Sequence, residues 1–199
     1  MQTIRLAPGF RLELVASEPM VQDPVALAFD EDGGLFVVEM RGFMPDVDGT
    51  GENAPIGRIS RLEDTDGDGR MDRSAVFADG LVLPRALAPT RGGLLYVAGG
   101  KLLFGRDTDG DGRADAITEI DPRYSTTITA LEHEPNGLLL ALDNWYYNAK
   151  STARYRMADG RWIRENTEFR GQWGISQDDH GRLFYNVNSS QLHADLVPP

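Results

Sequence analysis

The chain has 199 residues, of which 41% are hydrophobic, and its 31 acidic and 20 basic residues give a formal net charge of −11. The hydrophobic fraction suffices for a globular core. The acidic balance argues against partners that need a basic surface, namely nucleic acids and anionic membranes. The chain has no cysteine, so no disulfide, zinc–thiolate site or CxxCH haem attachment lies within it. No apolar run reaches the roughly 18 residues expected of a membrane span.

The N-terminal residues lack the features of a secretory leader, because Met1–Arg5 leads directly into Leu6–Phe10. We therefore expect a mature or excised segment of a periplasmic or extracellular protein. Within the N-terminal segment 1–20, Gly9–Ala16 alternates apolar and charged residues, which predicts an edge strand. In propellers such a strand often completes the last blade and closes the ring.

Four later stretches share one pattern: an apolar strand, a short polar turn with glycine, and a second apolar strand. The turns are expected at Gly34, Gly93, Gly137 and Gly181, which are 59, 44 and 44 residues apart. Self-similarity with a period of about 40–50 residues is typical of propeller blades. The glycine-containing turns supply the positive-φ residues that tight hairpins need. Each of the first three units continues into a second hairpin, so that four strands make one blade.

The sequence therefore predicts an all-β fold, namely a β-propeller of four-stranded antiparallel blades. Blade 1 is expected at 21–83, blade 2 at 84–125, blade 3 at 126–171 and the first hairpin of blade 4 at 172–199. About three and a half blades cannot close a ring, which takes roughly 4–8 blades. We therefore expect the chain to be part of a larger propeller.

Two nearly identical segments, Asp64–Asp72 and Asp107–Asp115, lie between the last two predicted strands of blades 1 and 2. Both have acids at positions 1, 3, 5 and 9 and glycine at position 6, as in the first part of an oxygen-ligand calcium loop. Side chains at this spacing converge on one hard cation, and position 7 offers its backbone carbonyl. The alternative is an acidic turn without an ion. The predicted ligands are Asp64, Asp66, Asp68, Arg70 and Asp72 in one loop and Asp107, Asp109, Asp111, Arg113 and Asp115 in the other.

The usual bidentate glutamate at position 12 is replaced by Ala75 and Thr118. With fewer anionic ligands we expect two weak structural calcium sites, with dissociation constants of roughly 10⁻⁴–10⁻³ M, suited to extracellular calcium.

Several segments carry a family resemblance. Asp143–Tyr146, Arg170–Gly174, Gln177–Phe184 and Asn188–His193 resemble the N-terminal propeller of large secreted proteins of planctomycete and verrucomicrobia type, which are often named membrane-bound dehydrogenases. That propeller is similar to quinoprotein glucose/sorbosone dehydrogenases. The resemblance implies a sugar or polyol substrate, pyrroloquinoline quinone as a cofactor, and a haem domain outside these residues.

Blade geometry predicts where a functional site would lie. The calcium loops would be on one face of the propeller, and the connections between consecutive blades and between the two middle strands would form a funnel on the other face. Carboxylate, amide and aromatic groups in such a funnel suit a sugar, a polyol or a planar quinone. The expected funnel residues are Glu39, Arg41, Arg85, Asn144, Trp145, Tyr146, Gln172, Trp173, Asn186 and Asn188, with Asp143 and His193 as candidate catalytic groups.

Each of these residues also has a plain structural interpretation. Trp145, Tyr146 and Trp173 suit packing between blades, and Asn186 and Asn188 suit loops that bond to their own backbone. The histidine base expected of a quinoprotein dehydrogenase is absent, because Gln172 and Trp173 occupy the place where it enters an inner strand.

Three functions follow from these features. The first is a calcium-binding dehydrogenase domain that oxidises a sugar or polyol and passes electrons to a haem domain. The second is a propeller that binds a carbohydrate or a protein without chemistry. The third is a propeller-type lactonase or hydrolase with an axial metal, for which Glu39, Asp143 and Asn186 are the candidate ligands.

Overall fold

The computed structural model describes residues 3–125 and 133–199, and within them the chain forms antiparallel sheets of consecutive strands. The first sheet contains β1 (Pro24–Phe29), β2 (Leu35–Glu39), β3 (Gly57–Glu63) and β4 (Arg73–Leu81). The second contains β5 (Ala86–Thr90), β6 (Gly93–Ala98), β7 (Lys101–Arg106) and β8 (Ala116–Asp121). The third contains β9 (Asn136–Leu140), β10 (Tyr146–Ala149), β11 (Ala153–Ala158) and β12 (Arg161–Asn166). The fourth contains β13 (Trp173–Gln177), β14 (Leu183–Val187) and β15 (Ser190–Ala194).

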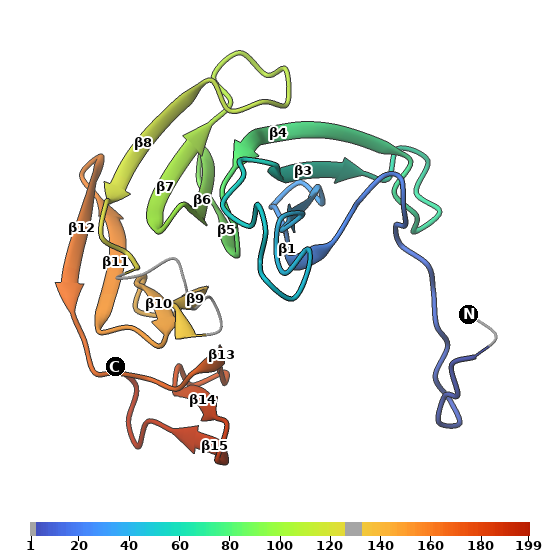
Figure 1. Cartoon of the computed structure of the whole chain (residues 1–199). Helices are drawn as coiled ribbons and strands as arrows, with labels where there is room; N and C mark the ends of the chain where they lie inside the picture. Colours follow the sequence, from blue (N-terminus) through green and yellow to red (C-terminus); the bar gives the residue numbers. More distant parts are fainter. Residues whose placement is uncertain (1–2, 126–132) are drawn as a thin grey trace.

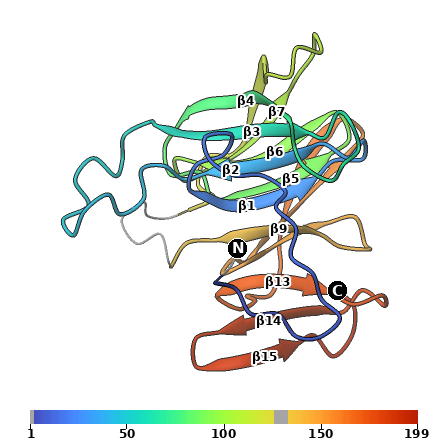
Figure 2. The ribbon, with the colours of Figure 1, turned by 90° about the vertical axis from the view of Figure 1, so that its right-hand side faces the viewer.

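The four sheets follow one another along an arc, with the first strand of each sheet on the concave side (Figure 1). Strand β5 contacts both β1 and β9, and β9 contacts β13, so these first strands line a common axis. Figure 2 shows the same sheets from the side, one following another. This arrangement of consecutive antiparallel blades is that of a β-propeller. The fold is therefore all-β, as the repeats predict, and the described part is an open arc.

Apolar clusters fill the seams between neighbouring sheets and hold the arc together. Phe36, Val38 and Ile59 of the first sheet pack against Leu87 and Tyr96 of the second. A second cluster joins the second and third sheets and contains Leu95, Phe104, Tyr146 and Tyr155. A third joins the third and fourth sheets through Trp145, Tyr147 and Leu183. Burial of apolar area in these seams, worth about 25 cal/mol per Å², fixes how the blades sit against one another.

The third sheet differs from the sequence prediction. Asn136 and Gly137 do not form a hairpin turn but begin β9, and Gly137 lies opposite Asn148 at a register shift in the β9–β10 ladder. The turn instead spans 141–145, where Ala141 and Trp145 pair and Asn144 has a φ of +65°. The predicted first strand of this unit begins within 126–132, which lies outside the described residues.

The two ends of the chain also differ from the prediction. Residues 9–16 form no strand, because no described strand lies alongside them as a hydrogen-bonded partner. The fourth sheet has a third strand, β15, which pairs with β14 through Phe184–Ala194 and Tyr185–His193. The expectation that this unit stops after its first hairpin is therefore wrong. The signal for β15 is weak because Ser190–Ala194 contains one large apolar residue, Leu192. Among the described residues, no helix has the length and apolar character needed to cross a membrane.

Candidate functional site

Two faces of the arc are defined by the connections between strands. The turns after the first and third strands of each sheet lie on what we call the aspartate face, which includes 64–72 and 107–115. The connections after the second strands and between sheets lie on the opposite, funnel face, which includes 40–56, 82–85 and 167–172. The predicted calcium loops and the predicted funnel are thus on opposite faces.

The first aspartate loop connects β3 to β4 and brings three carboxylates together. Asp64, Asp66 and Asp72 each offer an oxygen, and these oxygens lie within 4.8 Å of one another. Asp64 accepts hydrogen bonds from the backbone N–H groups of Gly67 at 2.7 Å and Gly69 at 2.8 Å. Asp72 accepts bonds from the hydroxyl and the N–H of Thr65. These hydrogen bonds hold the carboxylates of the loop close together.

The second loop repeats this geometry between β7 and β8. The oxygens of Asp107, Asp109 and Asp115 also lie within 4.8 Å of one another. Asp107 accepts bonds from Gly110 at 2.7 Å and Gly112 at 2.8 Å, and Asp115 accepts bonds from Thr108. Two separate segments thus adopt one arrangement. The predicted position-5 ligands are not part of either triad: Asp68 and Asp111 each accept the N–H of the residue two positions later, Arg70 and Arg113, at 2.8 Å.

The backbone N–H groups that surround these carboxylates favour the ionised forms. The N–H of Gly69, followed by that of Gly67, lowers the pKa of Asp64 below its usual 3.8. At Asp107 partial burial acts in the opposite direction, but the N–H groups of Gly112 and Gly110 prevail and the pKa is lowered as well. A carboxylate held ionised by backbone donors is prepared to bind a cation.

Each loop is also attached to a neighbouring element through the same position. The N–H of Ala114, at position 8 of the second loop, donates to the carbonyl of Phe77 in β4 at 2.8 Å. The N–H of Met71, at position 8 of the first loop, donates to the carbonyl of Val15 at 2.8 Å. The second loop therefore fastens the second sheet to the first, whereas the first loop fastens the first sheet to the N-terminal segment, which passes beside it in Figure 1.

A cavity of about 470 Å³ opens on the funnel face at the axis. The first strands of all four sheets contribute to its wall, and the connection after β2 adds apolar side chains. Of the predicted funnel residues it contains Arg85 and Trp173, which thus converge as expected. The lining residues are Val25, Ala26, Met40, Phe43, Arg85, Ala86, Asn136, Gly137 and Trp173.

Arg85 is the cationic group of this axial cavity. Its Nε donates to the carbonyl of Pro135 at 3.1 Å, and its Nη2 bonds to the hydroxyl of Ser125. Burial lowers its pKa, while Tyr124 and Glu134 act in the opposite direction. Nearby, the indole N–H of Trp173 donates to Asn188 at 3.1 Å. These contacts hold a guanidinium and an indole ring beside an apolar wall.

Glu39 and Arg41 form an internal pair. The carboxylate of Glu39 is fully buried and accepts bonds from Arg41 at 2.5 Å, from the N–H of Gln22 at 2.9 Å and from Ser60. The pair therefore attaches Gln22, just after the N-terminal segment, to the first sheet. With its oxygens engaged in this way, Glu39 is not exposed to a ligand.

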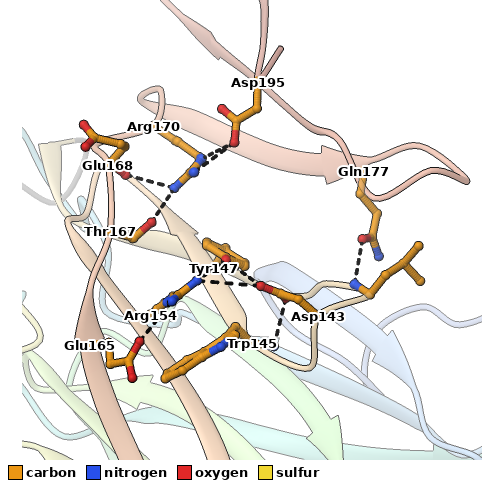
Figure 3. A network of polar contacts seen from close by, with 11 residues as sticks. Asp143, Trp145, Tyr147, Arg154, Glu165, Thr167, Glu168, Arg170, Gln177 and Asp195 are labelled. Atoms are coloured by element: carbon orange, nitrogen blue, oxygen red, sulfur yellow. Dashed lines mark hydrogen bonds and ion pairs between the residues drawn. The ribbon is translucent and has the colours of Figure 1, made fainter. Parts of the chain in front are cut away.

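Asp143, Asn144 and Trp145 do not lie in the funnel, contrary to the prediction. They form the turn 141–145 on the aspartate face, a consequence of the shifted hairpin in the third sheet. Asp143 accepts the N–H of Trp145 at 3.1 Å and the hydroxyl of Tyr147 at 2.8 Å, and these groups surround Arg154 (Figure 3). Tyr146 is buried in the seam between the second and third sheets.

The other candidates are spread over the fourth sheet. His193 lies in β15, stacked 5.6 Å from the ring of Tyr185, and Asp143 lies in the turn of the third sheet, so the two candidate catalytic groups belong to different sheets. The N–H of Gln172 donates to the carbonyl of Asn186 at 2.7 Å. Among the described residues, the side-chain oxygen of Asn186 and the Nε2 of His193 are buried without a hydrogen-bond partner.

A family described as a domain of unknown function, DUF7133, matches residues 1–199. The chain belongs to the DUF7133 family. No curated protein matches this DUF7133 chain. Among solved structures, the streptogramin B lyase structure is similar, with 12% sequence identity and a TM-score of 0.45 over 92% of this chain and 72% of that one.

The DUF7133 chain has a second, larger cavity, of about 690 Å³, on the aspartate face. It is lined by Phe29 and Asp30 of the first sheet, by Arg91, and by Asp107 and Asp111 of the second loop. Sequence reasoning missed it, and also missed Met40, Phe43 and Asn136 in the axial cavity. Asn136 was interpreted as a turn residue, and isolated apolar residues such as Met40 and Phe43 carry no pattern that distinguishes a cavity wall from a core.

Proposed function

We propose that this DUF7133 chain is a calcium-binding β-propeller domain whose two aspartate loops each hold one Ca²⁺. The observation that carries the proposal is the duplicated triad: Asp64, Asp66 and Asp72 in one loop and Asp107, Asp109 and Asp115 in the other share the same spacing and internal hydrogen bonds. Three carboxylates within 4.8 Å repel one another, and a hard divalent cation bound by oxygen ligands relieves that repulsion.

The role we assign to the ions is structural. Position 8 of each loop bonds to a neighbouring element, at Val15 or Phe77, so an ion that rigidifies the loop also secures this attachment. The missing position-12 glutamate favours affinities of roughly 10⁻⁴–10⁻³ M. Such sites would be filled in an extracellular or periplasmic compartment that is rich in calcium, and we propose this location for the domain.

A calcium titration combined with thermal melting tests the proposal. We expect a saturable rise in melting temperature for the parent chain, and its loss in the double variant Asp66→Asn/Asp109→Asn. In the parent chain, Asp66 accepts the N–H of Asp68 and Asp109 accepts the N–H of Asp111, both at 3.2 Å. Asparagine at these two positions keeps an oxygen acceptor for each bond but removes the negative charge. Asp46 and Asp178 accept backbone bonds in other acidic turns but belong to neither triad, so Asp46→Asn/Asp178→Asn is the matched control. A parent chain that does not respond to calcium would refute the proposal.

For the axial cavity we propose binding of a small sugar, polyol or planar anionic molecule. The supporting observation is the convergence of Arg85 and Trp173 beside an apolar wall, since an indole face and a guanidinium suit a ring that carries polar or anionic substituents. The resemblance to quinoprotein dehydrogenases suggests pyrroloquinoline quinone as one such molecule, with electron transfer to a haem domain as the further hypothesis.

The described lining residues fit a binding site better than a dehydrogenase centre. Removal of a hydroxyl proton needs a base within hydrogen-bond reach, and the side chains that line the axial cavity among residues 3–125 and 133–199 include no histidine or carboxylate. We therefore favour ligand recognition without turnover. The hydrolase alternative is less favoured, because Glu39 is buried in its pair with Arg41 and Asp143 lies on the opposite face.

Isothermal titration with glucose, sorbitol and the quinone, paired with a dye-reduction assay, separates these candidates. We expect saturable binding of at least one of these compounds, weakened in Arg85→Lys and unchanged in Arg91→Lys, whose parent residue lines the cavity on the other face. Dye reduction with bound quinone would favour the dehydrogenase. No binding of any of the three compounds would count against the axial site.

A further inference from the structure

Two of the three polar side chains that line the axial cavity are engaged within the protein. The amide nitrogen of Asn136 donates to two backbone carbonyls, at 2.9 and 3.2 Å, and its oxygen accepts a backbone N–H at 3.3 Å. The indole N–H of Trp173, which is the only donor of that side chain, bonds to Asn188. Neither Asn136 nor Trp173 therefore has a hydrogen-bond donor left for a molecule in the cavity.

Arg85 is the third polar side chain, and it keeps donors for a ligand. A guanidinium has five N–H donors, of which those bonded within the described part of the chain go to the carbonyl of Pro135 and the hydroxyl of Ser125. Both partners are uncharged. Burial lowers the pKa of Arg85, because a cation beside an apolar wall lacks the water that would stabilise its charge. An anion bound to the remaining N–H groups would supply that stabilisation.

The rest of the described cavity wall is apolar. Val25, Phe43 and Trp173 line it and are 48%, 39% and 37% exposed, so a ligand with an apolar body would remove part of their surface from water. The hydroxyl groups of a sugar or polyol would lose their water against the same wall without gaining partners, which is unfavourable for binding. The wall therefore selects a molecule that is apolar except where it meets Arg85.

We propose that the axial cavity binds a small molecule with one carboxylate and an apolar, ring-shaped body. The carboxylate accepts two parallel N–H bonds from the guanidinium of Arg85, and the ring lies against Phe43 and Trp173. This inference rests on the axial binding site proposed above and narrows its ligand from sugars, polyols and planar anions to the last of these. The volume of about 470 Å³ lies within the range of small-molecule sites.

Isothermal titration with 2-naphthoate, its uncharged analogue 2-naphthamide and sorbitol tests the inference. We expect saturable binding of naphthoate, binding of the amide that is weaker by about tenfold or more, and no binding of sorbitol. Arg85→Lys keeps the positive charge but removes the planar fork, and it should weaken naphthoate by about tenfold while the amide changes little. The matched control is Arg91→Lys, whose parent residue lies on the aspartate face and which should bind naphthoate as the parent chain does.

A second variant tests the apolar half of the site. Phe43→Ser leaves Arg85 in place and should weaken naphthoate and naphthamide alike, and circular dichroism verifies that each variant is folded. Sorbitol binding that matches naphthoate, or equal binding of naphthoate and its amide, would retain an axial binding site but overturn a carboxylate as its ligand. Naphthoate binding that Arg85→Lys does not weaken would overturn the assigned contact. A parent chain that binds none of these compounds, and neither glucose nor the quinone, would overturn both the inference and the axial site.

Discussion

The guanidinium carbon of Arg154 lies 4.4 Å from the centre of the Trp145 ring. Arg156 lies at the same distance from that ring, and Arg154 also bonds to Tyr147 at 2.8 Å and Glu165 at 2.9 Å (Figure 3). Stacking of a cation on an indole is worth about 0.5–2 kcal/mol. For Trp145 the sequence left open a place in the funnel and packing between blades, and the structure places it in the seam between the third and fourth sheets.

Replacement of Trp145 should therefore affect folding and leave ligand binding intact. We expect Trp145→Ala to lower the free energy of unfolding by about 3–5 kcal/mol, because it empties a buried aromatic site and removes the stacking surface of two arginines. Urea unfolding measures the loss. Trp173→Ala is the comparison, since Trp173 is 37% exposed and lines the axial cavity: it should cost less stability and weaken binding there.

The Glu39–Arg41 pair should stabilise the first sheet and the chain that leads into it, around Gln22. We expect Glu39→Ala to destabilise the chain by about 3–5 kcal/mol, because it leaves the arginine without its buried partner and removes the acceptor for the N–H of Gln22. Hydrogen exchange should increase in residues 15–23. The control is Arg11→Ala, which breaks an exposed ion pair with Glu13 and should change stability by less than about 1 kcal/mol. Equal exchange in the two variants would contradict this role for Glu39.

Two buried tyrosines should respond oppositely to loss of their hydroxyl groups. The hydroxyl of Tyr155 donates to Asp121 at 2.7 Å, whereas that of Tyr96 is buried without a partner among the described residues. Tyr155→Phe should therefore cost about 1–3 kcal/mol of stability, and Tyr96→Phe should be neutral or stabilising. Thermal melting of both variants at neutral pH measures the contrast, and a larger loss for Tyr96→Phe would contradict it.

Alkaline pH should lower the stability of the chain, in part because Tyr96 ionises. Burial raises the pKa of Tyr96 to about 12, above the value of about 10 in an unfolded chain. Folding thus favours the neutral phenol. The stability it contributes is complete below about pH 10 and is lost as the pH rises toward 12. We expect the melting temperature to fall over this interval, and to fall less steeply in Tyr96→Phe.

Calcium binding should persist into mildly acidic solution. Because the N–H groups of Gly69 and Gly67 hold the pKa of Asp64 below its usual 3.8, this ligand stays ionised until the pH falls below that value. The gain in melting temperature with calcium should therefore be similar at pH 7 and about pH 5, and should be lost only as the pH falls below the usual 3.8 and Asp64 takes up a proton. Disappearance of the gain already at pH 6 would contradict the assignment of the aspartates as ligands.

The blades could be predicted where turn chemistry and strand patterns agree. In the first and second sheets, glycine-containing turns at Gly34 and Gly93 separate apolar runs, and the structure pairs those runs as predicted. The convergence of the carboxylates in the two aspartate loops could also be predicted, from their spacing alone. Local hydrogen bonds within each loop bring the carboxylates together, so few distant residues are involved.

The third sheet shows why the rest could not be predicted. Asn136-Gly137 has the composition of a hairpin turn, yet it lies in a strand because Asn136 bonds to the fourth sheet, at Gln172 and Gly174. The actual turn is stabilised by Asp143, which caps Trp145. A hairpin turn is locally acceptable both at Asn136-Gly137 and at 141–145, so contacts between sheets decide which of the two segments forms it. The resulting shift moved three predicted funnel residues to the opposite face.

Gly137 allows the inner strands of the third and fourth sheets to lie close together. Its φ is +103°, and a Cβ there would lie 2.9 Å from the Cγ2 of Ile175 in the inner strand of the next sheet. A side chain at this position would press against Ile175 and would also strain the backbone at this φ, so one of the two inner strands would have to shift. The close approach of β9 and β13 at this seam thus depends on a missing methyl group.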